Sequence, residues 1–134
     1  MEYLIDMPVE IAELNKRVLV VEDDRAISRL LKHNIEDSAT VVTEAPTGLD
    51  GIKAISEARV DLVILDLRLP DFDGWGVLSL MKLTRSLCDI PVVIVSVEPP
   101  KAELIDRFGP KDYIQKPFDT RDLVTRIHKV MNCT

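Results

Sequence analysis

The chain has few aromatic residues, no long apolar run and no surplus of positive charge. Aromatic residues make up 4% of its 134 residues, so any hydrophobic core has to be built from aliphatic side chains. The longest uncharged apolar stretch runs from Ile90 to Val97, far short of the roughly 20 residues that a membrane-spanning helix requires. Its 17 Lys and Arg residues against 23 Asp and Glu residues give a net charge of −6, which argues against nucleic-acid binding through a basic face.

Cysteines and targeting signals are also scarce. The two cysteines, Cys88 and Cys133, form no CxxC motif and no Cys/His cluster, which argues against a structural zinc site. The first six residues include two acids and no basic stretch, unlike a secretory signal peptide. We therefore expect a protein of the reducing cytoplasm that does not enter membranes.

The composition is sufficient for one globular domain. Apolar residues make up 46% of the chain, and its length suits a single domain. We expect an N-terminal extension at 1–16, a domain at 17–131 and a C-terminal tail at 132–134. The extension contains scattered apolar residues, and the sequence leaves open whether it forms a short helix at Val9–Asn15 or a loosely docked tail.

Within 17–131, short apolar runs alternate with amphipathic segments. The runs predict five strands, at 18–21, 39–43, 62–65, 91–96 and 113–114. The amphipathic segments predict five helices, at 25–36, 48–58, 77–87, 102–108 and 120–130. The helix at 102–108 follows Pro99-Pro100 and should be short or irregular. Such alternation predicts an α/β domain with a doubly wound parallel sheet covered on both faces.

Polar residues follow the predicted buried strands where each one ends. They are Glu22 and Asp23, Asp66, Ser96, and Lys116. In a strand order of 2-1-3-4-5 the acids would converge between the first and third strands, where open α/β sheets bind ligands. Three carboxylates together favour a hard divalent cation such as Mg²⁺. With a lysine and a hydroxyl nearby, this is a site for a phosphoryl group with Asp66 as nucleophile, although each residue alone has an ordinary structural role.

Over about residues 17–131, the chain resembles the receiver domain of two-component response regulators. The resemblance is carried by VLVVEDD at 18–24, DLVILDLRLPDFDG at 61–74, IPVVIVS at 90–96 and DYIQKPF at 112–118. It implies a flavodoxin-like (βα)5 fold with a five-stranded sheet in the order 2-1-3-4-5. It also implies that Asp66 accepts a phosphoryl group from a histidine kinase or a phosphotransfer protein.

The resemblance further implies roles for particular residues. Mg²⁺ would be held by Asp23, Asp66, the backbone carbonyl of Arg68 and, through water, Glu22. Lys116 would bind the phosphoryl group, and Ser96 and Tyr113 would form the conformational switch. The peptide bond between Lys116 and Pro117 is usually cis in this family.

A receiver domain catalyses only its own phosphorylation and dephosphorylation, so we do not expect an enzyme acting on other substrates. The partners implied are the phosphodonor protein and either a downstream effector protein or a fused output domain. The resemblance also allows a homodimer.

The sequence departs from the family pattern near the proposed site. Val97 stands where a smaller residue, often Ala, is usual, and its side chain should crowd the phosphoryl group. The segment between Ser96 and Lys116 is shorter than usual. Arg68 and Glu98 flank the site, and we expect them either to pair across its mouth and slow the entry of water or to be two solvated charges.

Three other functions compete with that of a phosphorylated receiver. A haloacid-dehalogenase-type phosphatase needs a second aspartate two residues after its nucleophile, where this chain has Arg68. A flavin or nucleotide binder is disfavoured because the glycines form neither GxGxxG nor GxxxxGK[ST]. A degenerate receiver, which keeps the fold but binds a partner without being phosphorylated, is the main alternative.

Overall fold

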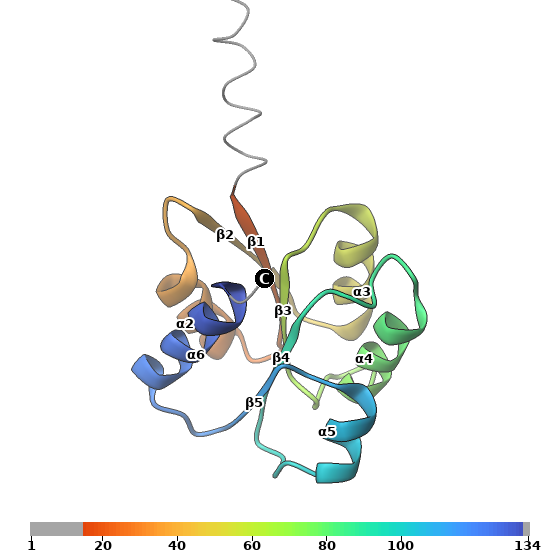
Figure 1. The fold of residues 1–134 in the computed structure, drawn as a ribbon. Coiled ribbons are helices and arrows are strands. Elements are labelled where there is room, and N and C mark those ends of the chain that lie inside the picture. The colour runs from red at the N-terminus through yellow and green to blue at the C-terminus, as the bar shows by residue number, and fades with distance from the viewer. Residues whose placement is uncertain (1–14, 133–134) are drawn as a thin grey trace, which may run out of the picture.

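The computed structural model describes residues 15–132, which form one five-stranded parallel sheet (Figure 1). The strands are β1 (Lys16–Val21), β2 (Thr40–Ala45), β3 (Leu62–Leu65), β4 (Val92–Ser96) and β5 (Asp112–Gln115). Their order is β2-β1-β3-β4-β5, and every neighbouring pair is parallel. This confirms the predicted α/β class and the strand order 2-1-3-4-5.

Helices cover both faces of the sheet, as expected for a doubly wound fold. They are α2 (Arg25–Ile35), α3 (Gly48–Glu57), α4 (Gly74–Leu83), α5 (Ala102–Phe108) and α6 (Thr120–Asn132). Figure 1 shows α2 and α6 on one face and α3, α4 and α5 on the other. Among these helices, none is long and apolar enough to cross a membrane. The helix considered at Val9–Asn15 lies, apart from Asn15, outside the described residues.

The sheet separates two layers of hydrophobic core, because successive side chains of a strand point to opposite faces. Val18 and Val20 of β1 belong to the layer under α2 and α6, where they meet Leu123 of α6. Leu19 and Val21 belong to the layer under α3 and α4. All four of these side chains are buried, which explains why the sequence from Val18 to Val21 is a continuous apolar run rather than an alternating one.

Several element boundaries differ by one to four residues from the sequence-based prediction, and the ends of α4 and β2 have clear structural reasons. The helix predicted to reach Leu87 ends at Leu83, because the backbone of Thr84 leaves the helical conformation at φ −101° and ψ 117°. The Thr84 hydroxyl donates to the carbonyl of Leu80 at 2.7 Å, and Leu87 lies in the following turns. Strand β2 extends to Ala45, two residues further than predicted, because its pairing with β1 continues to that residue.

Helix α5 confirms the prediction of a short helix after the two prolines. It has seven residues, no side chain caps its N-terminus, and none of its residues is buried. Gly109 ends the helix in the left-handed conformation, with φ of +63°, which glycine adopts without strain. The ring of Phe108 lies 5.7 Å from the ring of Trp75 in α4, so this short helix is anchored mainly by its last residue.

Candidate functional site

Three carboxylates converge at the carboxyl ends of β1 and β3. Glu22 and Asp23 follow β1, and Asp66 follows the neighbouring β3, where its N–H donates to the carbonyl of Val21 at 3.0 Å. One carboxylate oxygen from each acid lies within 4.8 Å of the others. Glu22 and Asp66 are 4% and 5% exposed, whereas Asp23 is open to solvent. The structure therefore brings together the three acids that the sequence predicted as a metal site.

Lys116 supplies positive charge to this cluster. Its ammonium group donates to Glu22 Oε1 at 2.5 Å and to Asp66 Oδ2 at 3.2 Å, and its side chain is only 10% exposed. Its backbone N–H donates to the carbonyl of Ser96 at 2.8 Å, which ties the end of β5 to the end of β4. The peptide bond between Lys116 and Pro117 is cis, as the family resemblance implied.

Burial and the neighbouring charges shift the pKa values of Glu22 and Lys116. Burial raises the pKa of Glu22, and the neighbouring Asp66 raises it further, against the lowering effect of Lys116, so that it reaches about 7. Burial lowers the pKa of Lys116, but the hydrogen bond and the charge of Glu22, with that of Asp66, raise it above its ordinary value. Lys116 is therefore a fixed positive charge, while Glu22 is poised to hold a proton near neutral pH.

The donor set fits a hard divalent cation. Three carboxylates face one ammonium group, so full ionisation leaves an excess of negative charge that a cation would neutralise. Beside the acids, a hollow of about 280 Å³ is lined by Glu22 and Asp23 together with Arg25 and Arg29 of α2. Glu22 and Asp23 therefore border a space that a small ligand can enter.

The predicted switch residues Ser96 and Tyr113 both contact Glu98. Ser96 is fully buried, and its Oγ accepts a hydrogen bond from the N–H of Glu98 at 3.4 Å. The hydroxyl of the half-buried Tyr113 donates to the carbonyl of Glu98 at 2.7 Å. The ring of Tyr113 also lies 6.5 Å from that of Trp75. One loop residue thus connects the Ser96 hydroxyl with the aromatic side chain on β5.

The side chains expected to tune the site lie at its outer edge. Arg68 Nε and Glu98 Oε1 form an ion pair at 3.3 Å, and the two side chains are 66% and 32% exposed. The N–H of Arg68 donates to Asp66 Oδ1 at 3.2 Å, so this ion pair begins directly beside the candidate nucleophile. Val97 is 45% exposed, which places much of its side chain in solvent.

Asp71 lies in the loop that also carries Arg68, and the sequence indicated it only as part of a turn. Its carboxylate accepts hydrogen bonds from the N–H groups of Gly48 and Leu49 at the start of α3, 23 and 22 residues away. No local pattern could reveal a contact across that separation. The cap that Thr47 provides for the same helix, by accepting from the N–H of Asp50 at 3.0 Å, has a recognisable local spacing.

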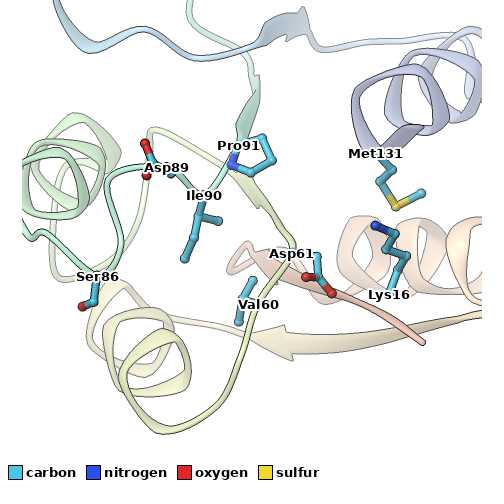
Figure 2. Close-up of a pocket in the computed structure, with 8 residues that line it drawn as sticks. All are labelled: Lys16, Val60, Asp61, Ser86, Asp89, Ile90, Pro91 and Met131. Atoms are coloured by element: carbon cyan, nitrogen blue, oxygen red, sulfur yellow. The ribbon is translucent and has the colours of Figure 1, made fainter. Parts of the chain in front are cut away.

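A second hollow, of about 270 Å³, lies at the opposite, amino-terminal edge of the sheet (Figure 2). Figure 2 shows Lys16 and Met131 on one side of it and Ser86 on the other. The carboxylate of Asp61 already accepts the N–H of Arg17 at 2.8 Å. Over residues 15–132, the one cluster of potential metal ligands is that of Glu22, Asp23 and Asp66, so the chemistry belongs to the carboxyl edge.

The raised pKa of Glu22 makes stability depend on pH. The folded-state pKa of Glu22, about 7, exceeds the ordinary value of 4.5. The contribution of Glu22 to stability is therefore largest below pH 4.5 and is lost as the pH rises towards 7. We expect the free energy of unfolding of Glu22→Gln, relative to wild type, to increase between pH 5 and pH 8. Urea unfolding in chelator-treated buffer measures the difference. A difference that stays constant over this range would contradict the assignment.

Comparison with known proteins agrees with this geometry. The family model described as the response regulator receiver domain matches residues 18–128. The transcriptional regulator RpaA of Synechocystis is 32% identical over 120 residues, covering 88% of this chain and 50% of its own. The regulator CseB of Streptomyces coelicolor is 36% identical over 119 residues, covering 85% and 48%. The chain thus spans about half the length of these curated relatives.

Solved structures show the same fold. A CheY-like receiver domain from Methanospirillum hungatei matches with a TM-score of 0.80 and 28% identity, covering 88% of this chain and 94% of that one. The non-phosphorylated HemR receiver domain from Leptospira biflexa matches with a TM-score of 0.81 and 28% identity, covering 90% and 97%. With its parallel sheet, its acidic cluster and Lys116 in the expected places, the chain belongs to the response regulator receiver domain family.

Proposed function

We propose that Asp66 accepts a phosphoryl group from the phosphohistidine of a histidine kinase or phosphotransfer protein. The observation that carries this proposal is the cluster of Glu22, Asp23 and Asp66 around Lys116. Asp66 shares Lys116 with Glu22 and accepts the N–H of Arg68. In this reaction the domain acts on itself and has no other substrate.

The residues of the site suit a magnesium ion. Asp23, Asp66 and the backbone carbonyl of Arg68 would hold it, with Glu22 acting through water. When bound, Mg²⁺ neutralises the charge of the acids and of the incoming phosphoryl group. The hard oxygen donors of this cluster are the type that Mg²⁺ prefers.

The proposed transfer is a nucleophilic displacement at phosphorus. An Asp66 carboxylate oxygen forms a bond to phosphorus while the bond from phosphorus to the imidazole nitrogen breaks, and that nitrogen keeps the electron pair. The Lys116 ammonium, which now donates to Asp66 and Glu22, can donate to the phosphoryl oxygens instead. The buried Ser96 hydroxyl is the second donor that the site offers.

The new charge can be transmitted through Glu98. Phosphorylation adds roughly −1.5 to −2 charges. If the Ser96 hydroxyl turns to this charge, it gives up the N–H of Glu98, whose carbonyl holds the Tyr113 hydroxyl. Moving such a switch from 1:99 to 99:1 requires about 5.5 kcal/mol, which a dianion beside Lys116 in a partly dry site can supply.

The relatives suggest which kind of protein receives the signal. RpaA and CseB are described as transcriptional regulators, and this chain matches about half of each. We infer that the signal passes to a fused output domain or to a separate effector protein, with a second copy of this chain as a further partner. The free thiol of Cys88 fits the reducing cytoplasm.

A degenerate receiver remains the alternative. The observation that favours it is α5, which is short and buries none of its residues, so this part of the usual receiver surface is altered. Such a domain would bind its partner equally well with and without phosphodonor.

The phosphoacceptor is tested by intact-mass measurement with Mg²⁺ and a small-molecule phosphodonor. We expect the wild type to gain the mass of one phosphoryl group and Asp66→Asn to gain none, because the amide removes the nucleophilic oxygen. Asp61→Asn is the matched control, since Asp61 lies at the opposite edge of the sheet and should leave the gain unchanged. No gain in the wild type with several donors would favour the degenerate receiver.

Removing the ion pair between Arg68 and Glu98 tests whether it shields the site from water. We expect Arg68→Ala, which keeps the backbone carbonyl, to speed dephosphorylation because water enters more easily. An exposed ion pair contributes up to about 1 kcal/mol, so the rate should rise by no more than about fivefold. Arg59→Ala, which breaks the exposed pair with Asp61, is the control. An unchanged phosphoryl lifetime in Arg68→Ala would show that the pair is merely solvated.

A further inference from the structure

The loop that joins β3 to α4 is hydrogen-bonded to α3, the preceding helix in the chain. Asp71, in the middle of this loop, directs its carboxylate at the amino terminus of α3. Oδ1 accepts the N–H of Gly48 at 2.8 Å, and Oδ2 accepts the N–H of Leu49 at 2.9 Å. Both donors belong to the first turn of α3, where N–H groups lack partners within the helix and the helix dipole favours negative charge.

The carboxylate of Asp71 is suited to this contact in its ionised form. Loss of hydration raises its pKa, but the hydrogen bonds from Leu49 and Gly48 lower it, with a further contribution from the N–H of Phe72, and the net pKa lies below its ordinary value. The Phe72 N–H donates to Oδ1 at 2.9 Å. The hydrogen bonds to α3 are therefore charge-assisted at neutral pH.

Gly48 allows the loop to approach this closely. A Cβ atom at this position would lie 2.6 Å from Cδ2 of Phe72 and 3.2 Å from Oδ1 of Asp71. Any larger residue would push the ring and the carboxylate away from the helix. The contact thus depends on two residues: Asp71 on the loop accepts the hydrogen bonds, and Gly48 at the start of α3 leaves room for the loop.

The same loop carries Arg68, whose carbonyl is one of the proposed metal ligands. Near its start, the Arg68 N–H donates to Asp66 Oδ1. Near its end, the N–H of Gly74 donates to the carbonyl of Leu67 at 2.8 Å. The backbones of Arg68 and Asp73 pair in an isolated antiparallel β-bridge. Between these points Leu69 packs against the core, and the side chain of Arg68 pairs with Glu98. The tie of the loop to α3 is through Asp71 and Phe72.

We propose that Asp71 is a positioning residue for the metal site, which holds the Arg68 loop against α3 so that its carbonyl is preset for the ion. This inference rests on the proposed function, because the Arg68 carbonyl matters only if a metal binds. Asp71 does not touch the ion and acts through the loop. Residues that orient metal ligands in this way typically contribute about 10- to 100-fold to metal affinity.

The test is Mg²⁺ affinity of the full chain, measured without any phosphodonor. Trp75, the only tryptophan of the sequence, follows Gly74 directly and serves as a fluorescent reporter, with calorimetry as an independent readout. We expect Asp71→Ala to weaken Mg²⁺ binding by roughly 10-fold. Asp71→Asn keeps one acceptor oxygen and should fall between Asp71→Ala and the wild type, which also protects the test should the alanine variant fold poorly.

Thr47→Ala is the matched control. It removes a hydrogen bond from the same helix terminus, the one to the Asp50 N–H, but leaves the loop tied to α3. We expect it to lower the urea midpoint much as Asp71→Ala does while leaving Mg²⁺ affinity within about twofold of the wild type. Equal loss of affinity in both variants, or unchanged affinity in Asp71→Ala, would overturn the proposal.

The two proposals can fail separately. If the wild type is phosphorylated and Asp71→Ala binds Mg²⁺ as tightly as the wild type, the role of Asp71 is refuted and the proposed function stands. If Asp71→Ala binds Mg²⁺ more weakly than Thr47→Ala but the wild type never gains a phosphoryl group, the phosphoacceptor function is refuted and the positioning role stands. A wild type without Mg²⁺ affinity refutes both.

Discussion

The site depends on one ammonium group shared between two buried carboxylates, with a third carboxylate beside them. Lys116 donates to both Glu22 and Asp66, and Asp23 brings a further negative charge within 4.8 Å. Burial strengthens both the attraction and the repulsion, so the cluster is held together but short of positive charge. Burial, and after it the neighbouring Asp66, raises the pKa of Glu22. A divalent cation and a phosphoryl group that engages Lys116 are the partners such a cluster can accept.

The sheet provides the rigidity that this unfavourable arrangement of charge requires. Glu22, Asp66 and Ser96 end or directly follow strands that are buried on both faces, so strand register alone sets their positions. Lys116 is placed by the hydrogen bond from its N–H to the carbonyl of Ser96. The exception is the loop that carries the Arg68 carbonyl, which no strand holds. The contact of Asp71 with α3 fastens this loop to a helix instead.

The sequence was most informative where local pattern and chain order determine the structure. Apolar runs that stop at Glu22 and Asp66 located the ends of β1 and β3, and the family resemblance supplied the strand order. The end of α4 was missed because it depends on the backbone of Thr84, which an apolar pattern reaching Leu87 does not reveal. The contact of Asp71 with α3 and the raised pKa of Glu22 arise from tertiary neighbours and burial, which one sequence does not specify.

The exchange of partners by Lys116 is the central claim, and a crystal structure with Mg²⁺ and beryllium trifluoride tests it most directly. Beryllium trifluoride mimics a phosphoryl group on a carboxylate oxygen. We expect it on Asp66, with the ion between Asp23, Asp66 and the Arg68 carbonyl, and with the Lys116 ammonium moved from Glu22 onto a fluorine atom. A crystal saturated with both reagents in which Asp66 is unmodified and Lys116 still donates to Glu22 would contradict the proposed mechanism.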